Sequence, residues 1–430
     1  MTALGTPLID AAVHDAVAMR QAGPALLGLA LMDARNRTLG WLAAFDGLPA
    51  SGASDGAAPA WWLAGQAAWF QEYWIARFVQ RGRGEAADAS APRLPSVDGR
   101  ADAWFAPRPG DPPARWQAPE PDSAALRAYL GATLDTTLDL LARATPDDDG
   151  LLVFRLALQH EDLLGEALAT RVQMQDLAPE RHQALVDQGL WPALPGRARR
   201  DPLCLPGQTV QCGSLPGGLV PAAERWAHPV PVPAFEIDAQ PVSWAEYVEF
   251  VADGGYDDSR WWTEAGWAML QATGRRAPRY VEQTGGGVLA RRHGRLQRLP
   301  LAQAVLHVNA HEAQAWCQWA GRRLPTEAEW LAAASSATAQ GFVWGELCEW
   351  MAGSARAWPA LGALADRLPA LDRGVADPAP GTGAAAPAGG LRVAHGASAW
   401  GSRRLRHLQA RRYLPAGADE QFIGFRSCAL

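Results

Sequence analysis

Apolar residues recur every three to four positions through most of the first 175 residues, which is the pattern of amphipathic helices. The spacing predicts four helices, over residues 24–45, about 59–81, about 123–141 and 150–177. Pro24 suits the first turn of the first helix, and Asp122 or Ser123 suits the N-cap of the third. A proline-rich stretch over 107–121 predicts an extended crossover. Four helices with one long crossover predict a four-helix bundle, whose inward faces can carry metal ligands.

The pattern changes after a stretch rich in Pro, Gly and Arg at 192–218. Apolar residues then alternate around 230–237, as in strands, and two further helices are predicted over 243–253 and 309–321. The Ala/Pro/Gly-rich tract at 357–390 predicts a loop or a partly disordered segment. We therefore expect an α+β fold in three parts: a helical bundle over 1–178, a Pro/Gly/Arg-rich linker over 179–218 and a second domain over 219–430.

Composition agrees with two globular domains and excludes several classes of partner. The 430 residues are 48% hydrophobic and 20% charged, which is ordinary for a folded chain of this length. With a net charge of -6, the chain lacks the excess of basic residues that would favour binding to a nucleic-acid backbone. No apolar run approaches the roughly 18 residues of a membrane span, and the first residues lack a signal-peptide layout. We expect a cytoplasmic protein; the sequence does not fix its oligomeric state.

The residue types narrow the available chemistry further. The chain has no lysine, so Schiff-base chemistry on a lysine side chain is excluded. Its 20 tryptophans can fill cores or line pockets for flat or cationic ligands. The 5 cysteines form no C-x-x-C pair, which favours reduced thiols over a disulfide framework or a zinc site.

The most informative string in the second domain is WAGRRLPTEAEW at 319–330. It predicts a helix ended by Gly321, a turn at Pro325 and a new helix capped by Thr326. It resembles the hallmark of the formylglycine-generating-enzyme-like fold, a C-type-lectin-like α+β domain, as do PVSWAEY at 241–247, GELCEW at 345–350 and GFR at 424–426. Residues 403–413 contain no cysteine, although formylglycine-generating enzymes hold copper there through a cysteine pair.

Two sequence strings in the predicted bundle restrict the resemblance to a smaller family. WLAGQAAWFQE at 62–72 and LQHEDLLGEAL at 158–168 resemble the metal-bearing helices of DinB-like bundles fused to this fold. The combination is similar to the ergothioneine/selenoneine synthase family; ALMDARNRTL at 30–39, WIAR at 74–77 and FRSC at 425–428 are closest to its selenoneine synthase branch. The resemblance implies non-heme Fe(II) and O₂, a C–Se or C–S bond formed on hercynine, a trimethylated histidine, and a separate chalcogen donor.

The family pattern implies three histidine ligands, one in G-H-x-x-W-F and two in H-E-x-x-H. Here His160 keeps the first H-E-x-x-H position, Leu164 occupies the second, and Gln66 replaces the histidine of the other motif. The candidate metal residues are therefore His160, Gln66 and Glu161, with Glu166 as a neighbouring acidic position. Leucine cannot ligate iron, and a glutamine carbonyl is a weak ligand, so Fe(II) binding is doubtful on ligand chemistry alone.

Candidate substrate-binding residues follow from the charges of hercynine, a quaternary ammonium and a carboxylate, which call for aromatic faces and arginine forks. Trp69, Tyr73 and Arg77 recur every four residues and share a helix face; Trp69, Glu72 and Arg77 also match family positions. Near the C-terminus, Arg412 and Tyr413 stand where the family has an R-N-F-type run. The alternative interpretation of the helical set, which the pattern favours slightly, is core tryptophan and surface charge.

Two function hypotheses remain. The first is an iron-dependent oxidoreductase that forms a C–Se or C–S bond on hercynine, which the resemblance favours. The second is a non-catalytic relative that has lost its iron site and acts as a small-molecule-binding or partner subunit, which the replaced ligands favour.

Overall fold

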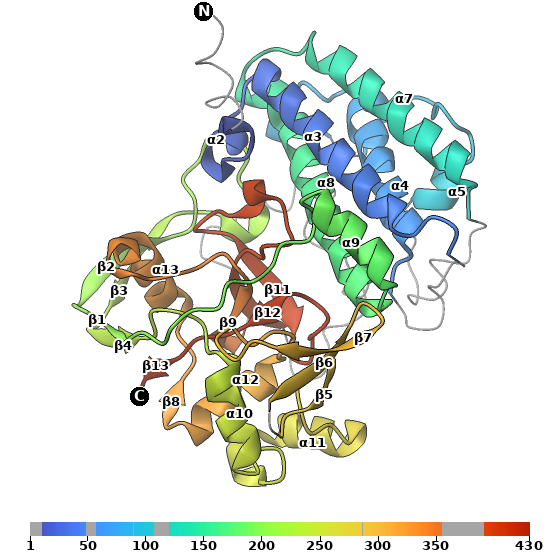
Figure 1. Ribbon diagram of the computed structural model, residues 1–430. Helices are drawn as coiled ribbons and strands as arrows, with labels where there is room; N and C mark the ends of the chain where they lie inside the picture. The colour runs from blue at the N-terminus through green and yellow to red at the C-terminus, as the bar shows by residue number, and fades with distance from the viewer. Residues whose placement is uncertain (1–10, 49–56, 89, 107–119, 286, 355–390) are drawn as a thin grey trace, which may run out of the picture.

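The computed structural model describes residues 11–48, 57–88, 90–106, 120–285, 287–354 and 391–430. The predictions for the 107–121 crossover and the 357–390 tract lie almost wholly outside these ranges. Two bodies are visible in Figure 1, a helical one at the N-terminal end of the chain and a mixed one at the C-terminal end. The division at residues 178 and 218 remains a prediction.

Four long helices form the helical body. They are α3 (Pro24–Ala43), α4 (Ala60–Gln71), α7 (Ser123–Leu141) and α8 (Asp148–Met174), with shorter α2 (Ala16–Arg20) and α5 (Ala101–Phe105) beside them. Pro24 occupies the first turn of α3, and the Asp122 carboxylate caps α7 by accepting from Ala125 N at 2.8 Å. The residues that favour a helix start thus predicted correctly where α3 and α7 begin.

The second predicted helix is too long. After Gln71 the chain widens into one π-helical turn, Glu72–Ala76, closed by a hydrogen bond from Arg77 N to Glu72 O. Phe78 then leaves the helix and forms a β-bridge with Arg93. The prediction of a helix to residue 81 is wrong because this backbone pairing, made by a loop further along the chain, replaces the next helical turn.

The segment predicted as a linker contains regular structure. Helix α9 (Pro179–Asp187) begins at a proline suited to a first turn, with Glu180 next to it. Strands β1 (Leu203–Leu205) and β2 (Gln208–Cys212) pair with β4 and β3 of the second body. Part of the segment predicted as a plain linker over 179–218 thus forms a helix and strands, because short strands give little periodic signal and are fixed by their partners.

The second body is built around two four-stranded sheets, with the strand orders β1-β4-β13-β8 and β11-β10-β9-β12. Two smaller sheets, β2-β3 and β5-β6-β7, lie beside them. The strands are β3 (His228–Val232), β4 (Phe235–Ile237), β5 (Val281–Gln283), β6 (Val288–Arg292), β7 (Arg295–Leu299), β8 (Arg322–Arg323), β9 (Cys348–Ser354), β10 (Leu391–Gly396), β11 (Arg411–Pro415), β12 (Ile423–Gly424) and β13 (Cys428–Ala429). The helices are α10 (Trp244–Ala252), α11 (Glu264–Thr273), α12 (Ala310–Trp319) and α13 (Glu327–Ser336).

Capping boxes fix the starts of three of these helices. Ser243 with Glu246, Asn309 with Glu312 and Thr326 with Glu329 each exchange reciprocal side-chain-to-backbone hydrogen bonds. The predicted helix–turn–helix over 319–330 is confirmed: α12 ends at Trp319, β8 follows, and Thr326 caps α13.

A buried arginine fastens the C-terminal end. Arg426 is fully buried and pairs with Glu349 of β9, while its remaining N–H groups reach the carbonyls of Asp238 and Val343. Because a buried charge needs such partners, Arg426 stabilises the position of the last strand in the sheet.

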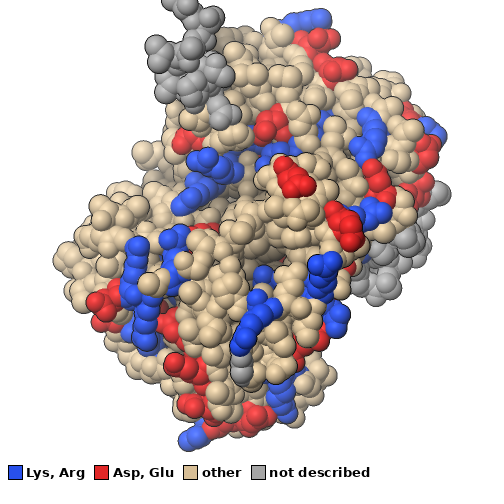
Figure 2. All heavy atoms as spheres, in the orientation of Figure 1, with Lys and Arg blue, Asp and Glu red and all other residues tan. Residues whose placement is uncertain are grey.

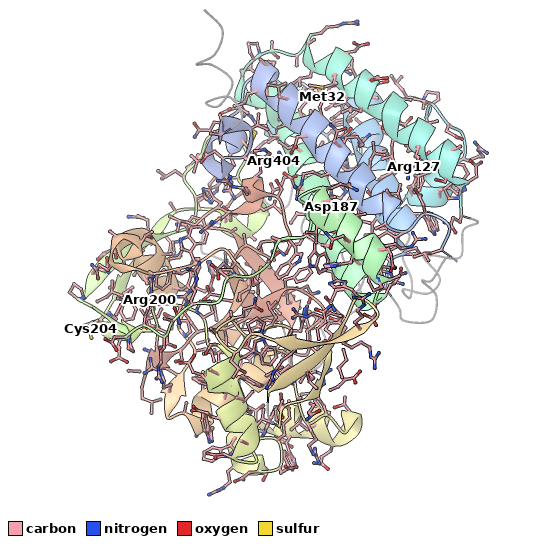
Figure 3. All side chains as sticks on the ribbon, in the orientation of Figure 1. Met32, Arg127, Asp187, Arg200, Cys204 and Arg404 are labelled. Carbon is pink, nitrogen blue, oxygen red and sulfur yellow. The ribbon has the colours of Figure 1, made fainter. Side chains whose placement is uncertain are left out.

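Buried ion pairs join the two bodies. Arg404 donates to both carboxylate oxygens of Asp162 in α8 at 2.7 Å and to Asp33 of α3 at 2.6 Å. Figure 3 shows Arg404 at the junction between the bundle and the second body. The bundle is therefore held against the second body by charge as well as by apolar contact.

The surface and the helix lengths add two further facts. On the face shown in Figure 2, acidic and basic side chains are interspersed over both bodies. Within the described ranges, none of the helices combines the length and apolar character that crossing a bilayer would require.

Candidate functional site

The candidate metal position lies inside the bundle, on α8. His160 is 2% exposed, and its ring stacks on Phe70 of α4 with centroids 4.1 Å apart and an interplanar angle of 24°. Helix α8 starts at a defined point because the carboxylate of Asp147 accepts from Gly150 N at 2.7 Å. The imidazole is thus held between two packed helices.

Gln66 of α4 meets His160 directly. The Nε2 atom of His160 lies 3.2 Å from Oε1 of Gln66, while Nε2 of Gln66 donates to the carbonyl of Phe105 at 3.3 Å. Because that second bond fixes which end of the amide faces the ring, the ring nitrogen donates to the amide oxygen and carries the proton. A protonated Nε2 has no lone pair for a metal ion.

Leu164 occupies the position one turn along α8. It is 1% exposed and belongs to the hydrophobic cluster that contains Trp41, Leu168 and Trp400. An i, i+4 pair shares a helix face, so this is where a second ligand beside His160 would lie. In this chain the face is filled by core packing.

Glu161 makes a different set of contacts. Its Oε1 accepts from Arg35 Nε at 2.8 Å and from Thr38 Oγ1 at 2.9 Å, and its Oε2 accepts from Gln71 Nε2 at 2.7 Å. Arg35 and Glu161 are each 1% exposed. The carboxylate is thus part of a buried ion-pair network between α3, α4 and α8.

The donors at this position do not fit an iron ion. His160 and Gln66 share a hydrogen bond, Leu164 has no donor atom, and the charge of Glu161 is matched by Arg35. Among the residues that the structure describes, no group of three or more His, Cys, Asp or Glu side chains is arranged to hold a metal ion. Of the three predicted metal residues, the structure brings His160 and Gln66 together and gives Glu161 other partners.

Two predicted substrate-binding residues meet at one carboxylate. Asp102 of α5 accepts from Trp69 Nε1 at 2.7 Å and from both terminal nitrogens of Arg77, at 2.7 and 3.0 Å. Arg77 lowers the pKa of Asp102 through these bonds. Trp69 stacks on Tyr73 with centroids 4.6 Å apart, and the Arg77 guanidinium lies 5.4 Å from the Tyr73 ring centre. The predicted shared face exists, and its polar groups bond within the bundle.

Glu72, the third predicted residue on this segment, faces α7. Its carboxylate accepts from Tyr129 Oη at 2.6 Å and from Ser96 Oγ and Val97 N. Burial and the neighbouring carboxylate raise the pKa of Tyr129 well above its usual range. Glu72 thus ties the π-helical turn to α7 and to the loop around residue 96.

Arg412 spans the junction of the two bodies. From β11 its NH1 and NH2 donate to the two carboxylate oxygens of Glu166 in α8, at 2.9 and 2.6 Å. Ser398 Oγ donates to the same carboxylate at 2.9 Å. Burial would lower the pKa of Arg412, but the neighbouring Cys348 and Glu166 together raise it above its usual range. The bidentate ion pair between Arg412 and Glu166 therefore occupies the junction where the two bodies face each other.

Tyr413 lies on the same strand but in other surroundings. It pairs with Val393 of β10, and the guanidinium of Arg411 lies 5.1 Å from its ring centre. Burial raises the pKa of Tyr413. Successive strand residues point to opposite faces of a sheet, so Arg412 and Tyr413 do not form one site.

The sequence pattern did not identify the residues that hydrogen-bond to the candidate site residues. Arg35, Gln71, Asp102 and Ser398 supply those contacts. Arg35 lies on the apolar face of a long helix, and a charged residue at a core position is a detectable sign of a buried partner. Asp102 and Ser398 carry no comparable signal, since only the fold brings them near.

Comparison with known proteins places this chain in a family. Residues 195–374 match the model of the Sulfatase-modifying factor enzyme 1-like domain. The chain is 33% identical over 284 residues to the Hercynine oxygenase of Mycobacterium tuberculosis, an alignment that covers 64% of this chain and 62% of that protein. It is 33% identical over 328 residues to the Hercynine oxygenase of Mycolicibacterium thermoresistibile, covering 74% of this chain and 68% of that protein.

Two further relatives mark the limits of the match. The Hercynine oxygenase of Mycolicibacterium smegmatis is 35% identical over 224 residues, and the chain spans 47% of its length. The Formylglycine-generating enzyme of Streptomyces coelicolor is 31% identical over 173 residues, which is 36% of this chain. The chain thus spans between about half and two thirds of the hercynine oxygenases it matches. It belongs to the hercynine oxygenase family.

Proposed function

We propose that this chain is a hercynine-directed member of its family that no longer carries out iron-dependent turnover in the bundle. Three relatives at 33–35% identity are hercynine oxygenases, which supports hercynine or a similar betaine as the ligand. In this proposal the helical body is DinB-like, and the protein acts as a small-molecule-binding or partner subunit.

One observation carries the loss of turnover. Nε2 of His160 donates to Oε1 of Gln66 at 3.2 Å inside the bundle. Metal ligation through Nε2 would require His160 to give up that proton and that bond, and Oε1 of Gln66 would lose the donor it now accepts from. Leu164 supplies nothing in exchange, since its side chain is apolar and buried.

The ion pair of Glu166 with Arg412 supports the same proposal. Both carboxylate oxygens are engaged by one guanidinium, and Ser398 adds a third hydrogen bond. A ligand that needs Glu166 or Arg412 must break a partly buried bidentate pair, which costs more than displacing water.

A second candidate is favoured by the comparisons. It is an oxidoreductase of the selenoneine or ergothioneine type, using non-heme iron and O₂ to form a C–Se or C–S bond on hercynine. Similarity that covers 68% of one hercynine oxygenase supports it. Because the described residues do not fit iron, no catalytic step is assigned to them.

Binding and turnover separate the two candidates. Hercynine is titrated into the protein by calorimetry without O₂, and O₂ consumption is then followed with hercynine, Fe(II) and either γ-glutamylcysteine or a selenosugar. Hercynine binding without O₂ consumption supports the first candidate. Consumption that depends on hercynine and is abolished in His160→Ala supports the second, and absence of both binding and consumption contradicts a hercynine-directed role.

A further inference from the structure

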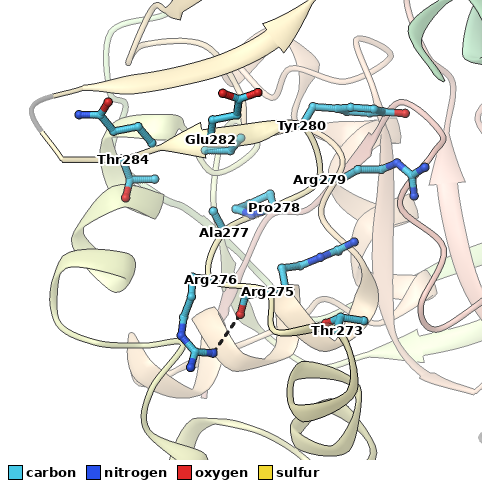
Figure 4. Close-up of a pocket in the computed structure, with 11 residues that line it drawn as sticks. Thr273, Arg275, Arg276, Ala277, Pro278, Arg279, Tyr280, Glu282 and Thr284 are labelled. Atoms are coloured by element: carbon cyan, nitrogen blue, oxygen red, sulfur yellow. Dashed lines mark hydrogen bonds between the residues drawn. The ribbon is translucent and has the colours of Figure 1, made fainter. Parts of the chain in front are cut away.

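A cavity of about 610 Å³ lies in the second body, lined by one segment, residues 273–284, that runs from the end of α11 through β5 (Figure 4). Contacts at both ends fix the path of this segment. Gly274 ends α11 in the left-handed region at φ 64°. Tyr280 has φ 68°, and its carbonyl accepts from Arg291 N of β6 at 2.9 Å. A bulky residue with positive φ is unusual and persists only where the surrounding contacts hold it.

The charged side chains on the cavity wall are mostly basic. Three arginines line the cavity, Arg275, Arg276 and Arg279, against one acidic residue, Glu282. The carboxylate of Glu282 accepts from Arg291 Nε at 2.6 Å, so its charge is matched by a residue outside the lining. The wall therefore presents an excess of positive charge, which favours an anionic ligand.

A buried carboxylate holds two of these arginines from outside the lining. Asp419 is 3% exposed; its Oδ1 accepts from Arg279 NH1 at 3.0 Å and its Oδ2 accepts from Arg275 NH1. Because one carboxylate binds both guanidinium groups, they lie side by side, and Figure 4 shows them extending in the same direction. Arg276 extends in another direction and pairs with Asp257 at 3.0 Å. Among the described residues, the hydrogen bonds of Arg275 and Arg279 to carboxylates all come from NH1, which leaves NH2 of each for a ligand.

The other carboxylates near this arginine pair are weaker partners. Glu312 lies 3.8 Å from Arg275 NH1, and burial raises its pKa to about 7, so it is only partly ionised at pH 7. Glu420 lies 3.4 Å from Arg279 NH1, and its side chain is 35% exposed, so solvent weakens that pair. The two arginines thus share one firmly held carboxylate, and a second anion would stabilise both.

We propose that this cavity binds the phosphate group of a small phosphate ester, with Arg275 and Arg279 as its paired anchors. A phosphate monoester carries nearly two negative charges and three acceptor oxygens, so it can accept from two guanidinium groups at once. A carboxylate offers one charge and two oxygens. The volume of about 610 Å³ leaves room for the rest of the ligand. None of the lining residues is a candidate hercynine or metal residue, so this site is separate from the proposed function.

The test titrates glycerol 3-phosphate into the full chain by calorimetry, with glycerol as its neutral match. Arg275→Gln and Arg279→Gln each remove an anchor, and Arg279→Lys keeps the charge beside Asp419 but loses the guanidinium fork. Arg295→Gln is the matched control, because Arg295 is exposed on β7 and does not line the cavity. We expect glycerol 3-phosphate to bind the wild-type chain and the control alike, and each anchor variant about tenfold more weakly or worse. Glycerol should bind none of them.

Competition and thermal unfolding supply further readouts. Inorganic phosphate should displace glycerol 3-phosphate, and acetate at the same concentration should not. Millimolar glycerol 3-phosphate should raise the Tm of the wild-type chain and of Arg295→Gln more than that of Arg279→Lys, which decides the test if either glutamine variant fails to fold. No binding to the wild-type chain, equal binding by the anchor variants, an equal loss in Arg295→Gln, binding of glycerol, or no displacement by phosphate overturns the proposal. None of these results bears on hercynine or iron.

Discussion

Nε2 of His160 and Oε1 of Gln66 lie 3.2 Å apart in the interior of the bundle, where relatives implied by the sequence pattern would place two metal-binding histidines. Gln66 also donates from Nε2 to the carbonyl of Phe105, so both ends of its side-chain amide are hydrogen-bonded within the protein. Because Nε2 of His160 and Oε1 of Gln66 are engaged with each other, a metal ion could use either atom only by breaking their hydrogen bond.

Restoring the family pattern should restore metal binding. The double variant Gln66→His/Leu164→His places three imidazoles on α4 and α8, and we expect at least about tenfold more bound iron than in the wild-type chain. The measurement is iron content after anaerobic loading and desalting. Each single variant is the control and should bind markedly less iron than the pair. No gain in a folded double variant would show that the surrounding backbone has diverged as well.

The ion pair of Arg35 and Glu161 should be essential for bundle stability. Arg35→Met leaves the buried carboxylate without its counter-charge, so we expect the free energy of unfolding to fall by about 3–5 kcal/mol in urea titrations. Arg35→Met/Glu161→Leu, which removes both charges, should recover part of that loss. Arg127→Gln is the control, because its pair with Asp46 is exposed and should contribute less than about 1 kcal/mol. A similar small effect at Arg35 would contradict the assigned role.

Stability should fall in mild acid partly through His307. Its folded pKa is about 3, against about 6.5 when unfolded, because burial disfavours the charged ring. The unfolded state therefore takes up a proton first, so this contribution is complete above about pH 6.5 and is lost as the pH falls toward 3. At pH 5 the loss relative to pH 8 should be roughly 2 kcal/mol.

His307→Asn checks that assignment, since asparagine tolerates the positive φ of 61° at this position. Urea unfolding at pH 8 and pH 5 should show a smaller drop for the variant than for the wild type. Identical pH dependence in the two proteins would mean that His307 is not the group that titrates.

Local signals predicted much of the fold. Asp122 and Thr326 cap their helices where the sequence placed them, because an N-cap depends only on the next three residues. The four bundle helices and the helix–turn–helix at 319–330 follow from periodicity in the same way.

Contacts between distant residues could not be predicted. Arg412 and Glu166 are 246 positions apart, and Arg35 and Glu161 are 126 apart, so neither pair leaves a trace in local spacing. The sequence showed that two ligand positions were replaced, but only the structure shows Gln66 turning its amide oxygen to His160. The end of the helix predicted over about 59–81 was likewise missed, because Phe78 pairs with Arg93, which a loop further along the chain supplies.

Bound metal is the most direct test of whether the bundle position around His160 holds iron. The chain is purified without O₂, incubated with Fe(II), desalted and analysed for iron beside His160→Ala. We expect both proteins to retain the same background amount of iron. Stoichiometric iron in the wild-type chain that disappears in His160→Ala would contradict this expectation.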